Sequence, residues 1–304
     1  MRQNRDIAII IPAYNATATV RETLSSIQAQ ADLSRVSAVY LADDASADNT
    51  VEVARSYWTS DVPLVISENE RNRGERATVN DLVSALPGSI DWFLILHADD
   101  IAKRDWIAVM AGETENAGSK VISITASYNV LFEDGRVVPG EDFGLKETKL
   151  IEGTPGSIRS TLERGCWFKV SSCAIQVAGF RQLGGFKTDM PQLGDWEFVL
   201  RALEAGYAIE YIPMCLSTYR QDRQSVSSKS FRENRDVQEA LRILREYRTY
   251  LPRVPMIRRH LFYLNALARR SARALLLRDF RRFRNGIVLG MRVGLSLMKY
   301  SVAR

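Results

Sequence analysis

No glycine occurs before Gly74 in this chain of 304 residues. A dinucleotide-binding GxGxxG turn and a Walker A phosphate loop both need glycines directly after a strand. The first apolar run, residues 7–11, therefore cannot lead into either loop. A nucleotide held at the end of that run needs another arrangement, in which carboxylates accept from the base and a divalent cation neutralises the phosphates.

Cysteine and histidine are also scarce, with three and two residues respectively. Cys166, Cys173 and Cys215 form no CxxC pair, which argues against a zinc ribbon and against a disulfide scaffold. His97 and His260 are too few for a histidine-rich metal site. Residues 1–6 do not resemble a signal peptide, so we expect a protein of the reducing cytosol.

Charged residues are plentiful but unevenly distributed. Residues 229–304 contain 19 basic and 5 acidic residues, whereas residues 1–228 contain 22 basic and 31 acidic ones. The net charge of +5 therefore combines an acidic body at −9 with a basic tail at +14. Such an asymmetry indicates that the two parts have different partners.

Short apolar runs alternate with helical patterns through the first hundred residues. This alternation predicts an α/β fold with a doubly wound, mostly parallel sheet that has helices on both faces. Ligands of such sheets bind outside the carboxyl ends of the strands, where the pairs Asp43–Asp44 and Asp99–Asp100 lie. The predicted strands are residues 7–11, 36–41, 64–66 and 92–96.

Local signals predict how several elements begin and end. Thr19 and Glu22 have the spacing of a capping box at the first helix. Residues 133–136 are typical of a hairpin turn, and residues 140–164 are polar enough to predict a long loop. A helix around residues 196–203 ends before Gly206, a typical residue after a helix C-terminus.

Five segments together resemble the inverting glycosyltransferases of family 2, which have the GT-A fold. Three are residues 9–15 (IIIPAYN), 41–48 (LADDASAD) and 94–100 (LILHADD). Residues 194–207, which begin GDWEFVLR, resemble the later acidic motif of that family. Tyr219 and Arg220 with residues 225–227 resemble the segment that follows it. The five motifs stand in the family's order within residues 5–230, so their combination is specific.

The resemblance implies a role for each matching residue. Asp195 would be the catalytic base that takes the proton of an acceptor hydroxyl. Asp99 and Asp100 would hold Mn²⁺ or Mg²⁺ on the donor diphosphate, and Arg220 and Ser225 would contact its phosphates. The acceptor candidates are Trp196 and Glu197. The implied nucleotide-binding residues are Pro12, Ala13, Tyr14, Asn15, Asp43, Asp44, Arg76 and Asp99.

Simpler interpretations stay open for some of these residues. His97 stands where the family usually has the first aspartate of Asp-X-Asp, and it is either a ligand or a spacer. Asp44 also suits a helix cap, and Asp195 suits a helix N-terminus on electrostatic grounds alone. Trp196 fits burial in a core as well as stacking on a sugar, and Glu197 fits a structural role.

The basic tail has three interpretations. Residues 251–304 contain 13 basic residues and one acid, Asp279, interleaved with leucines, which favours an amphipathic helix on an anionic membrane surface. Residues 286–303 are apolar but interrupted by Arg292 and Lys299, so a membrane-spanning helix is not expected. No nucleic-acid motif accompanies the charge, and we expect no nucleic-acid partner. The third interpretation is a helical subdomain that packs on the core or on a second subunit, so a homo-oligomer stays open.

The sequence thus predicts a metal-dependent glycosyltransferase that uses a nucleotide-diphosphate sugar, expected to be a UDP-sugar, and a glycan or lipid-linked acceptor. We expect a catalytic domain at residues 1–230, with a nucleotide half at 1–127 and an acceptor half at 128–230, and a basic helical extension at 231–304. The expected location is cytoplasmic, peripheral at the inner face of the membrane. The rival functions are a nucleotidyltransferase, which usually has a Gly-rich N-terminal loop, and a non-catalytic nucleotide-binding membrane adaptor.

Overall fold

The computed structural model divides the chain into two compact units. The N-terminal unit comprises Met1–Thr154 and Trp167–Gln221, and the C-terminal unit comprises Pro155–Cys166 and Asp222–Arg304. The sequence alone places the boundary after residue 230, whereas helix α5 (Pro155–Arg164) is part of the C-terminal unit. The structure describes residues 5–140, 145–222 and 226–302.

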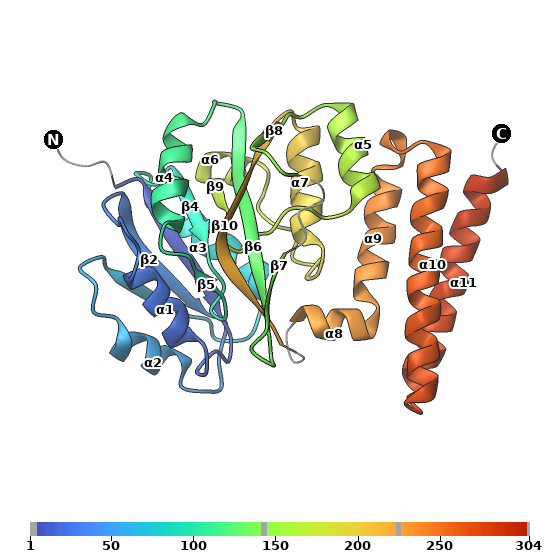
Figure 1. Cartoon of the computed structure of the whole chain (residues 1–304), viewed down its shortest axis with the longest axis horizontal. Coiled ribbons are helices and arrows are strands. Elements are labelled where there is room, and N and C mark those ends of the chain that lie inside the picture. The colour runs from blue at the N-terminus through green and yellow to red at the C-terminus, as the bar shows by residue number, and fades with distance from the viewer. Residues whose placement is uncertain (1–4, 141–144, 223–225, 303–304) are drawn as a thin grey trace. The chain divides into compact units, whose positions relative to one another are not determined.

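Within the described residues, ten strands form one mixed sheet in the N-terminal unit, in which β1 to β4 are parallel to one another and β6 is parallel to β10 (Figure 1). Their order is β3-β2-β1-β4-β9-β6-β10-β5, with β7 paired to β6 and β8 paired to β10. The register places Ile10 of β1 between Tyr40 of β2 and Ile95 of β4, both in parallel. Strand β9 runs antiparallel between β4 and β6. The strands are β1 (Ile7–Ala13), β2 (Val36–Asp43), β3 (Leu64–Glu68), β4 (Trp92–Ile95), β5 (Ile101–Ala102), β6 (Val121–Phe132), β7 (Val137–Pro139), β8 (Lys149–Ile151), β9 (Ala174–Gln176) and β10 (Ala208–Gln221).

Helices cover both faces of this sheet, as the sequence predicts (Figure 1). All seven residues of β1 are buried, which is typical of a parallel strand with helices on either side. Ile9 and its neighbours on one face pack in a core with α1 (Val20–Gln28), α2 (Thr50–Tyr57) and α4 (Trp106–Asn116). On the other face, the ring of Phe93 meets Phe180 at 5.1 Å between centroids, beside α3 (Glu75–Ala85), α6 (Val177–Gln182) and α7 (Gly194–Glu204).

Every regular element among the described residues of the C-terminal unit is a helix. The predicted helical extension of residues 231–304 is interrupted near its start at Asn234, whose φ of 58° is left-handed. An ion pair between Arg270 and Asp236 at 2.8 Å joins α10 to α9, and His260 Nε2 lies 3.1 Å from Ser296 Oγ of α11. None of the described helices is long and apolar enough to cross a membrane. Besides α5, the helices are α8 (Val226–Glu233), α9 (Arg235–Glu246), the 3-10 turn η1 (Arg248–Tyr250), α10 (Arg253–Leu276) and α11 (Phe280–Val302).

Three local predictions have different outcomes. Gly206 follows α7 with a φ of 85°, so the predicted helix end is confirmed. The predicted long loop at residues 140–164 is wrong, because its described part contains β8 and α5. The capping box is also wrong. Thr19 Oγ1 donates instead to the Ala98 carbonyl at 2.9 Å, and Glu22 pairs with Arg220. Both side chains therefore join the first helix to the ends of distant strands.

Candidate active site

The loops at the carboxyl ends of β1 and β2 are hydrogen-bonded to each other. The amide of Asn15 donates to Ser46 Oγ at 2.8 Å, and the amide of Ala47 donates to Asn15 Oδ1 at 2.8 Å. Asn15 (φ 49°) and Ala45 (φ 60°) have left-handed backbone, which costs free energy in residues other than glycine. The side-chain bonds between the two loops offset this cost and hold the loops together.

The four predicted nucleotide residues of the first loop differ in exposure. Pro12 and Ala13 are buried, whereas Tyr14 is 53% exposed and Asn15 is also exposed. Pro12 and Ala13 therefore form the floor of this edge of the sheet. Tyr14 and Asn15 present side chains that a ligand can reach.

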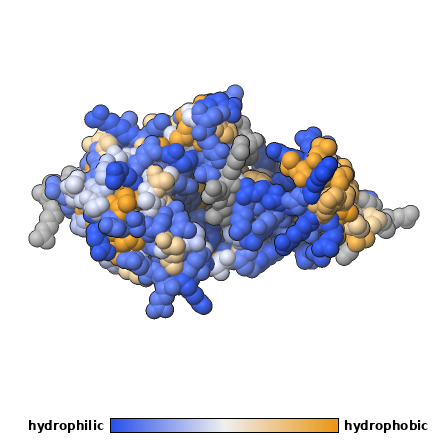
Figure 2. Space-filling view, turned by 90° about the horizontal axis from the view of Figure 1, so that it is seen from below, coloured by the Kyte–Doolittle hydropathy of each residue, from blue (hydrophilic) through white to orange (hydrophobic). Residues whose placement is uncertain are grey.

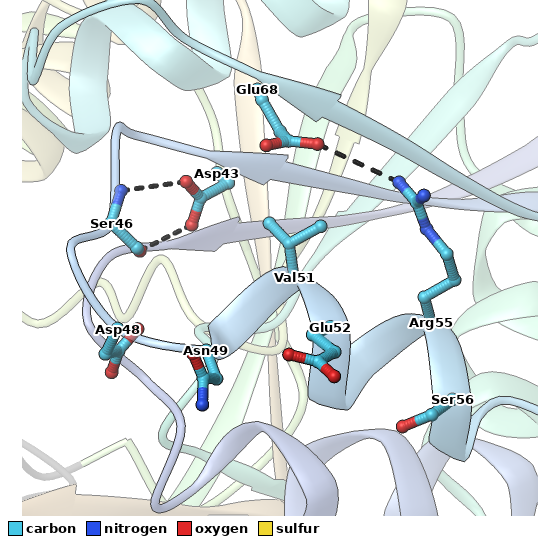
Figure 3. Close-up of a pocket in the computed structure, with 9 residues that line it drawn as sticks. All are labelled: Asp43, Ser46, Asp48, Asn49, Val51, Glu52, Arg55, Ser56 and Glu68. Carbon is cyan, nitrogen blue, oxygen red and sulfur yellow. Dashed lines mark hydrogen bonds and ion pairs between the residues drawn. The ribbon is translucent and has the colours of Figure 1, made fainter.

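Asp43 shapes the second loop from the end of β2. One of its oxygens accepts from the Ser46 amide at 2.8 Å and the other from Ser46 Oγ at 2.5 Å, so the side chain is directed at Ser46 (Figure 3). It borders a pocket of about 470 Å³ between the ends of β2 and β3 and the start of α2. Among the predicted site residues, this pocket contains Asp43 alone. Its lining residues are Asp43, Ser46, Asp48, Asn49, Val51, Glu52, Arg55, Ser56 and Glu68.

Asp44 fixes the chain that leads into α3. Its carboxylate accepts from the amide of Arg73 at 2.9 Å, the amide of Gly74 at 2.7 Å and the Asn69 side chain at 2.8 Å. Asp44 therefore caps a segment near α3 rather than the helix that follows β2. A carboxylate accepts about four hydrogen bonds, so capacity for a nucleotide base remains.

The first residue of α3 connects this loop to the end of β4. Glu75 Oε1 lies 3.1 Å from His97 Nε2 and 3.4 Å from Arg76 Nη1. Burial alone would raise the pKa of Glu75, but Arg76, His97 and Lys169 together hold it well below its usual range. The ionised carboxylate thus fixes Nε2 of His97 and leaves Nδ1 directed toward Asp100 Oδ2, at 3.7 Å. A histidine held by a carboxylate in this way is common among metal ligands.

His97, Asp99 and Asp100 offer ligand atoms that all lie within 4.8 Å of one another. Asp100 is 1% exposed, and its Oδ1 accepts from the Arg220 amide at 3.0 Å. Its Oδ2 is buried and accepts no hydrogen bond from the described residues, an arrangement that is costly unless a cation binds there. Burial and the charge of Asp100 raise the pKa of Asp99 to about 6. These carboxylate and imidazole donors fit Mn²⁺ or Mg²⁺.

Arg220 makes three contacts around the aspartate pair that the sequence did not predict. Besides the amide on Asp100, its Nε donates to the Asp99 carbonyl at 3.1 Å, and its guanidinium pairs with Glu22. Arg220 therefore holds the Asp100 carboxylate and the Asp99 backbone from the end of β10. Ser225, the other predicted phosphate residue, lies outside the described residues.

The first turn of α7, which contains Asp195, packs against the start of α3. Asp195 is partly exposed, and its Oδ1 accepts from the Trp196 amide at 2.8 Å. A Cβ built on Gly194 would lie 3.3 Å from Arg76 Nε, so the helix start packs closely on Arg76. Arg76 is 5% exposed and stacks on Phe186 at 4.9 Å. Arg76 is therefore a buried residue that supports the site indirectly, because it contacts Glu75 and the start of α7.

The two acceptor candidates need correction. Trp196 is 1% exposed and Glu197 is fully buried. The Glu197 carboxylate accepts from Arg201 at 2.9 and 3.0 Å and from Lys187 at 3.0 Å. Both side chains face the core because residues 196 and 197 lie on the covered side of α7. Trp196 is therefore a core residue and Glu197 a buried ion-pair partner, and neither side chain is placed to contact an acceptor.

Lys169 is a site residue that sequence reasoning missed. It precedes β9, which runs antiparallel to β4, and this order brings residues 169–172 beside the end of β4. The Ser172 amide donates to the Ile95 carbonyl at 2.5 Å, and the His97 amide donates to Ser171 Oγ at 3.3 Å. No periodicity or motif singles out Lys169, because only the strand pairing places it there.

Comparison with known proteins agrees with this arrangement. The family model described as "Glycosyl transferase family 2" matches residues 8–168, more than half of the chain. The chain belongs to this family. This glycosyltransferase is 27% identical over 244 residues to an uncharacterized glycosyltransferase of Haemophilus influenzae, which covers 79% of this chain and 76% of the relative.

Two further similarities bear on its biology and fold. It is 28% identical to the O-antigen chain rhamnosyltransferase WbaN of Salmonella anatum over 67% of this chain and 62% of WbaN. A crystal structure of S. aureus TarS 1–349 in complex with UDP-GlcNAc superposes with a TM-score of 0.62 and 19% identity, covering 79% of this chain and 66% of TarS. The likeness to TarS confirms the GT-A type of fold. This glycosyltransferase thus spans slightly under two thirds of WbaN.

Proposed function

We propose that this glycosyltransferase moves a sugar from a UDP-sugar to a hydroxyl of a cell-surface polysaccharide or lipid-linked glycan, with inversion at the anomeric carbon. The supporting observation is that three acidic elements meet around the start of α3. Asp44 holds Gly74, Glu75 holds His97, and Gly194 beside Asp195 packs on Arg76. WbaN, named for O-antigen chains, and TarS, seen with UDP-GlcNAc, supply the acceptor and donor classes of the proposal.

Asp195 is the proposed catalytic base. It lies in the first turn of α7, where a negative charge interacts favourably with the helix dipole. The Asp195 carboxylate would accept the proton of the acceptor hydroxyl as the oxygen attacks the anomeric carbon. Attack on the side opposite the diphosphate inverts the configuration.

Asp99 and Asp100 are the proposed ligands of Mn²⁺ or Mg²⁺, and Nδ1 of His97 is the proposed third donor. A bound cation supplies charge for the departing diphosphate. Arg220 keeps Asp100 in place through its amide, and Glu75 keeps the His97 ring in place. Tyr14, Asn15, Asp43 and Asp44 form the proposed nucleotide edge.

Metal-dependent binding of UDP tests this proposal. The double substitution Asp99→Ala with Asp100→Ala should abolish the part of UDP affinity that depends on Mn²⁺, measured by calorimetry with and without the metal. Asp91→Ala, an exposed acid at the start of β4, is the matched control and should bind as wild type. Equal binding and transfer by wild type in excess chelator would contradict the metal site.

The C-terminal unit is proposed to lie on an anionic membrane surface. Leu276, Leu277 and Phe280, where α10 turns into α11, are 84%, 67% and 66% exposed, with exposed arginines at 278 and 281. Figure 2 shows apolar surface beside strongly polar surface on these helices. Apolar side chains next to arginines are typical of helices that bind the headgroup region of acidic lipids. Further exposed apolar residues along α11 are Ile287, Val288, Met291, Leu295 and Met298.

A further inference from the structure

Lys169 lies two residues before Ser171, whose Oγ accepts from the His97 amide at the edge of the cation cluster. Its charge interacts with Asp100 of the cation cluster and with Asp195, the proposed base. It also helps to lower the pKa of Glu75 and opposes the rise in the pKa of Asp99. The charge of Lys169 therefore acts on the proposed base and on the proposed cation ligands alike.

Two aromatic rings hold the ammonium in this place. Nζ lies 3.4 Å from the ring centroid of Tyr219 on β10 and 5.5 Å from that of Tyr128 on β6. The Lys169 carbonyl accepts from Thr125 Oγ1 at 3.2 Å, which ties its backbone to β6 as well. Cation–π contacts of this kind stabilise a lysine charge without neutralising it. Although burial alone would lower the pKa of Lys169, Asp100, the two tyrosines and Asp195 raise it, so the group stays charged.

Once a cation binds, the charge of Lys169 is no longer balanced by the aspartates of the cation cluster. Asp99 and Asp100 are the proposed ligands of that cation, and their charge then balances the metal rather than the lysine. Arg220 is already paired with Glu22, and Arg76 is stacked on Phe186 beside Glu75. Lys169 is therefore the described cation best placed to meet a second anion at this point.

From this geometry we propose that Lys169 binds the β-phosphate of the sugar-nucleotide donor and stabilises the diphosphate as it leaves. The proposal rests on the proposed function and adds a phosphate-binding residue to it. The ammonium donates hydrogen bonds to phosphate oxygens that gain charge as the bond to the anomeric carbon breaks. No proton needs to be transferred by Lys169 in this step.

Binding of uridine, UMP and UDP to wild type and to Lys169→Met, with Mn²⁺ present, tests the proposal by calorimetry. Methionine keeps most of the length of the unbranched side chain and removes its charge. UDP affinity should fall about 10-fold to 100-fold, as for loss of a charged hydrogen bond, while uridine and UMP affinities change less than about threefold. Lys169→Arg should restore most of the UDP affinity. Lys103→Met, an exposed lysine in the same unit, is the matched control.

The outcomes separate this proposal from the proposed function. UDP binding by Lys169→Met that equals wild type overturns the role of Lys169 alone. An equal loss of affinity for all three ligands also overturns it, because a purely structural lysine would produce that pattern. Wild-type protein that binds none of the three ligands and transfers no sugar from UDP-sugars overturns the proposed function first.

Discussion

The two units of this glycosyltransferase use charge in opposite ways. In the N-terminal unit, Asp43, Asp44 and Asp100 at the ends of strands accept hydrogen bonds from specific groups, as Asp44 does from two backbone amides. In the C-terminal unit, most arginines of α10 and α11 lie exposed beside exposed apolar residues. Held carboxylates suit one small ligand in one geometry, whereas exposed arginines suit an extended, fluid partner. The comparison indicates that the N-terminal unit determines which small ligand binds, whereas the C-terminal unit determines where in the cell the protein binds.

The largest expected effect comes from the base. Asp195→Asn should lower the rate of sugar transfer about 10²-fold to 10⁴-fold, because an amide cannot accept the acceptor proton. Donor binding should stay within about twofold of wild type, since the side chain remains in place. Initial rates with a UDP-sugar and calorimetry with UDP measure the two quantities. Transfer at the wild-type rate would assign the base elsewhere.

The second prediction concerns the exposed apolar residues of the C-terminal unit. Changing Leu276, Leu277 and Phe280 to serine should reduce binding to vesicles of acidic phospholipid more than about tenfold, because each loses buried apolar area in the lipid. Co-sedimentation measures the binding, and UDP affinity should not change. A control triple variant takes exposed apolar residues of the N-terminal unit to serine, at Val65, Val137 and Met214.

Vesicle binding by the first triple variant that equals wild type would remove the membrane role of these residues. Strong binding of wild type to neutral vesicles in high salt would instead contradict the part assigned to the arginines, because their attraction to acidic lipid is screened by salt.

The third prediction concerns stability in the N-terminal unit. Glu197→Gln should lower the free energy of unfolding by about 3 kcal/mol, because it leaves Arg201 and Lys187 without their buried carboxylate. Urea unfolding followed by tryptophan fluorescence measures this, since all five tryptophans lie in this unit. Glu70→Gln, at an exposed position, is the control. A loss of activity without a loss of stability would return Glu197 to the acceptor site.

The smallest effect is a pH dependence confined to the C-terminal unit. Burial lowers the pKa of His260 below 6.5, although its hydrogen bond to Met256 opposes this. The unfolded chain then binds more protons than the folded one, so stability is full above pH 6.5 and decreases as pH falls through the folded pKa. Far-UV circular dichroism during urea unfolding should detect the decrease, and tryptophan fluorescence should not. His260→Gln should remove the difference between the two probes.

Much of the fold could be predicted because its signals are local. The run at residues 7–11 and its successors have the composition of buried parallel strands, and the structure confirms each of them. Gly206 marks a helix end that depends only on its own backbone. The break at Asn234 was missed because it depends on the left-handed backbone of that residue, which no apolar pattern signals.

The candidate site was predictable only where its residues carry a local signal. Asp43, Asp44, Asp99 and Asp100 follow strands, so their place at one edge follows from a parallel sheet. Glu75 and Lys169 carry no such signal, since one begins a helix and the other precedes an antiparallel strand. Trp196 fitted both core and sugar contact in the sequence, and its burial decided the matter.

The sequence by itself determined the alternation of strands and helices, the acidic pairs at the strand ends and the basic tail, because composition and period are properties of neighbouring residues. Only the tertiary structure decided the partners of those acids. Thr19, Glu22 and Arg220 come from distant parts of the chain to the end of β4. Lys169 reaches the same place because β9 pairs with β4. Hydrogen bonds and charges act through space, and chain order does not encode which distant groups will meet.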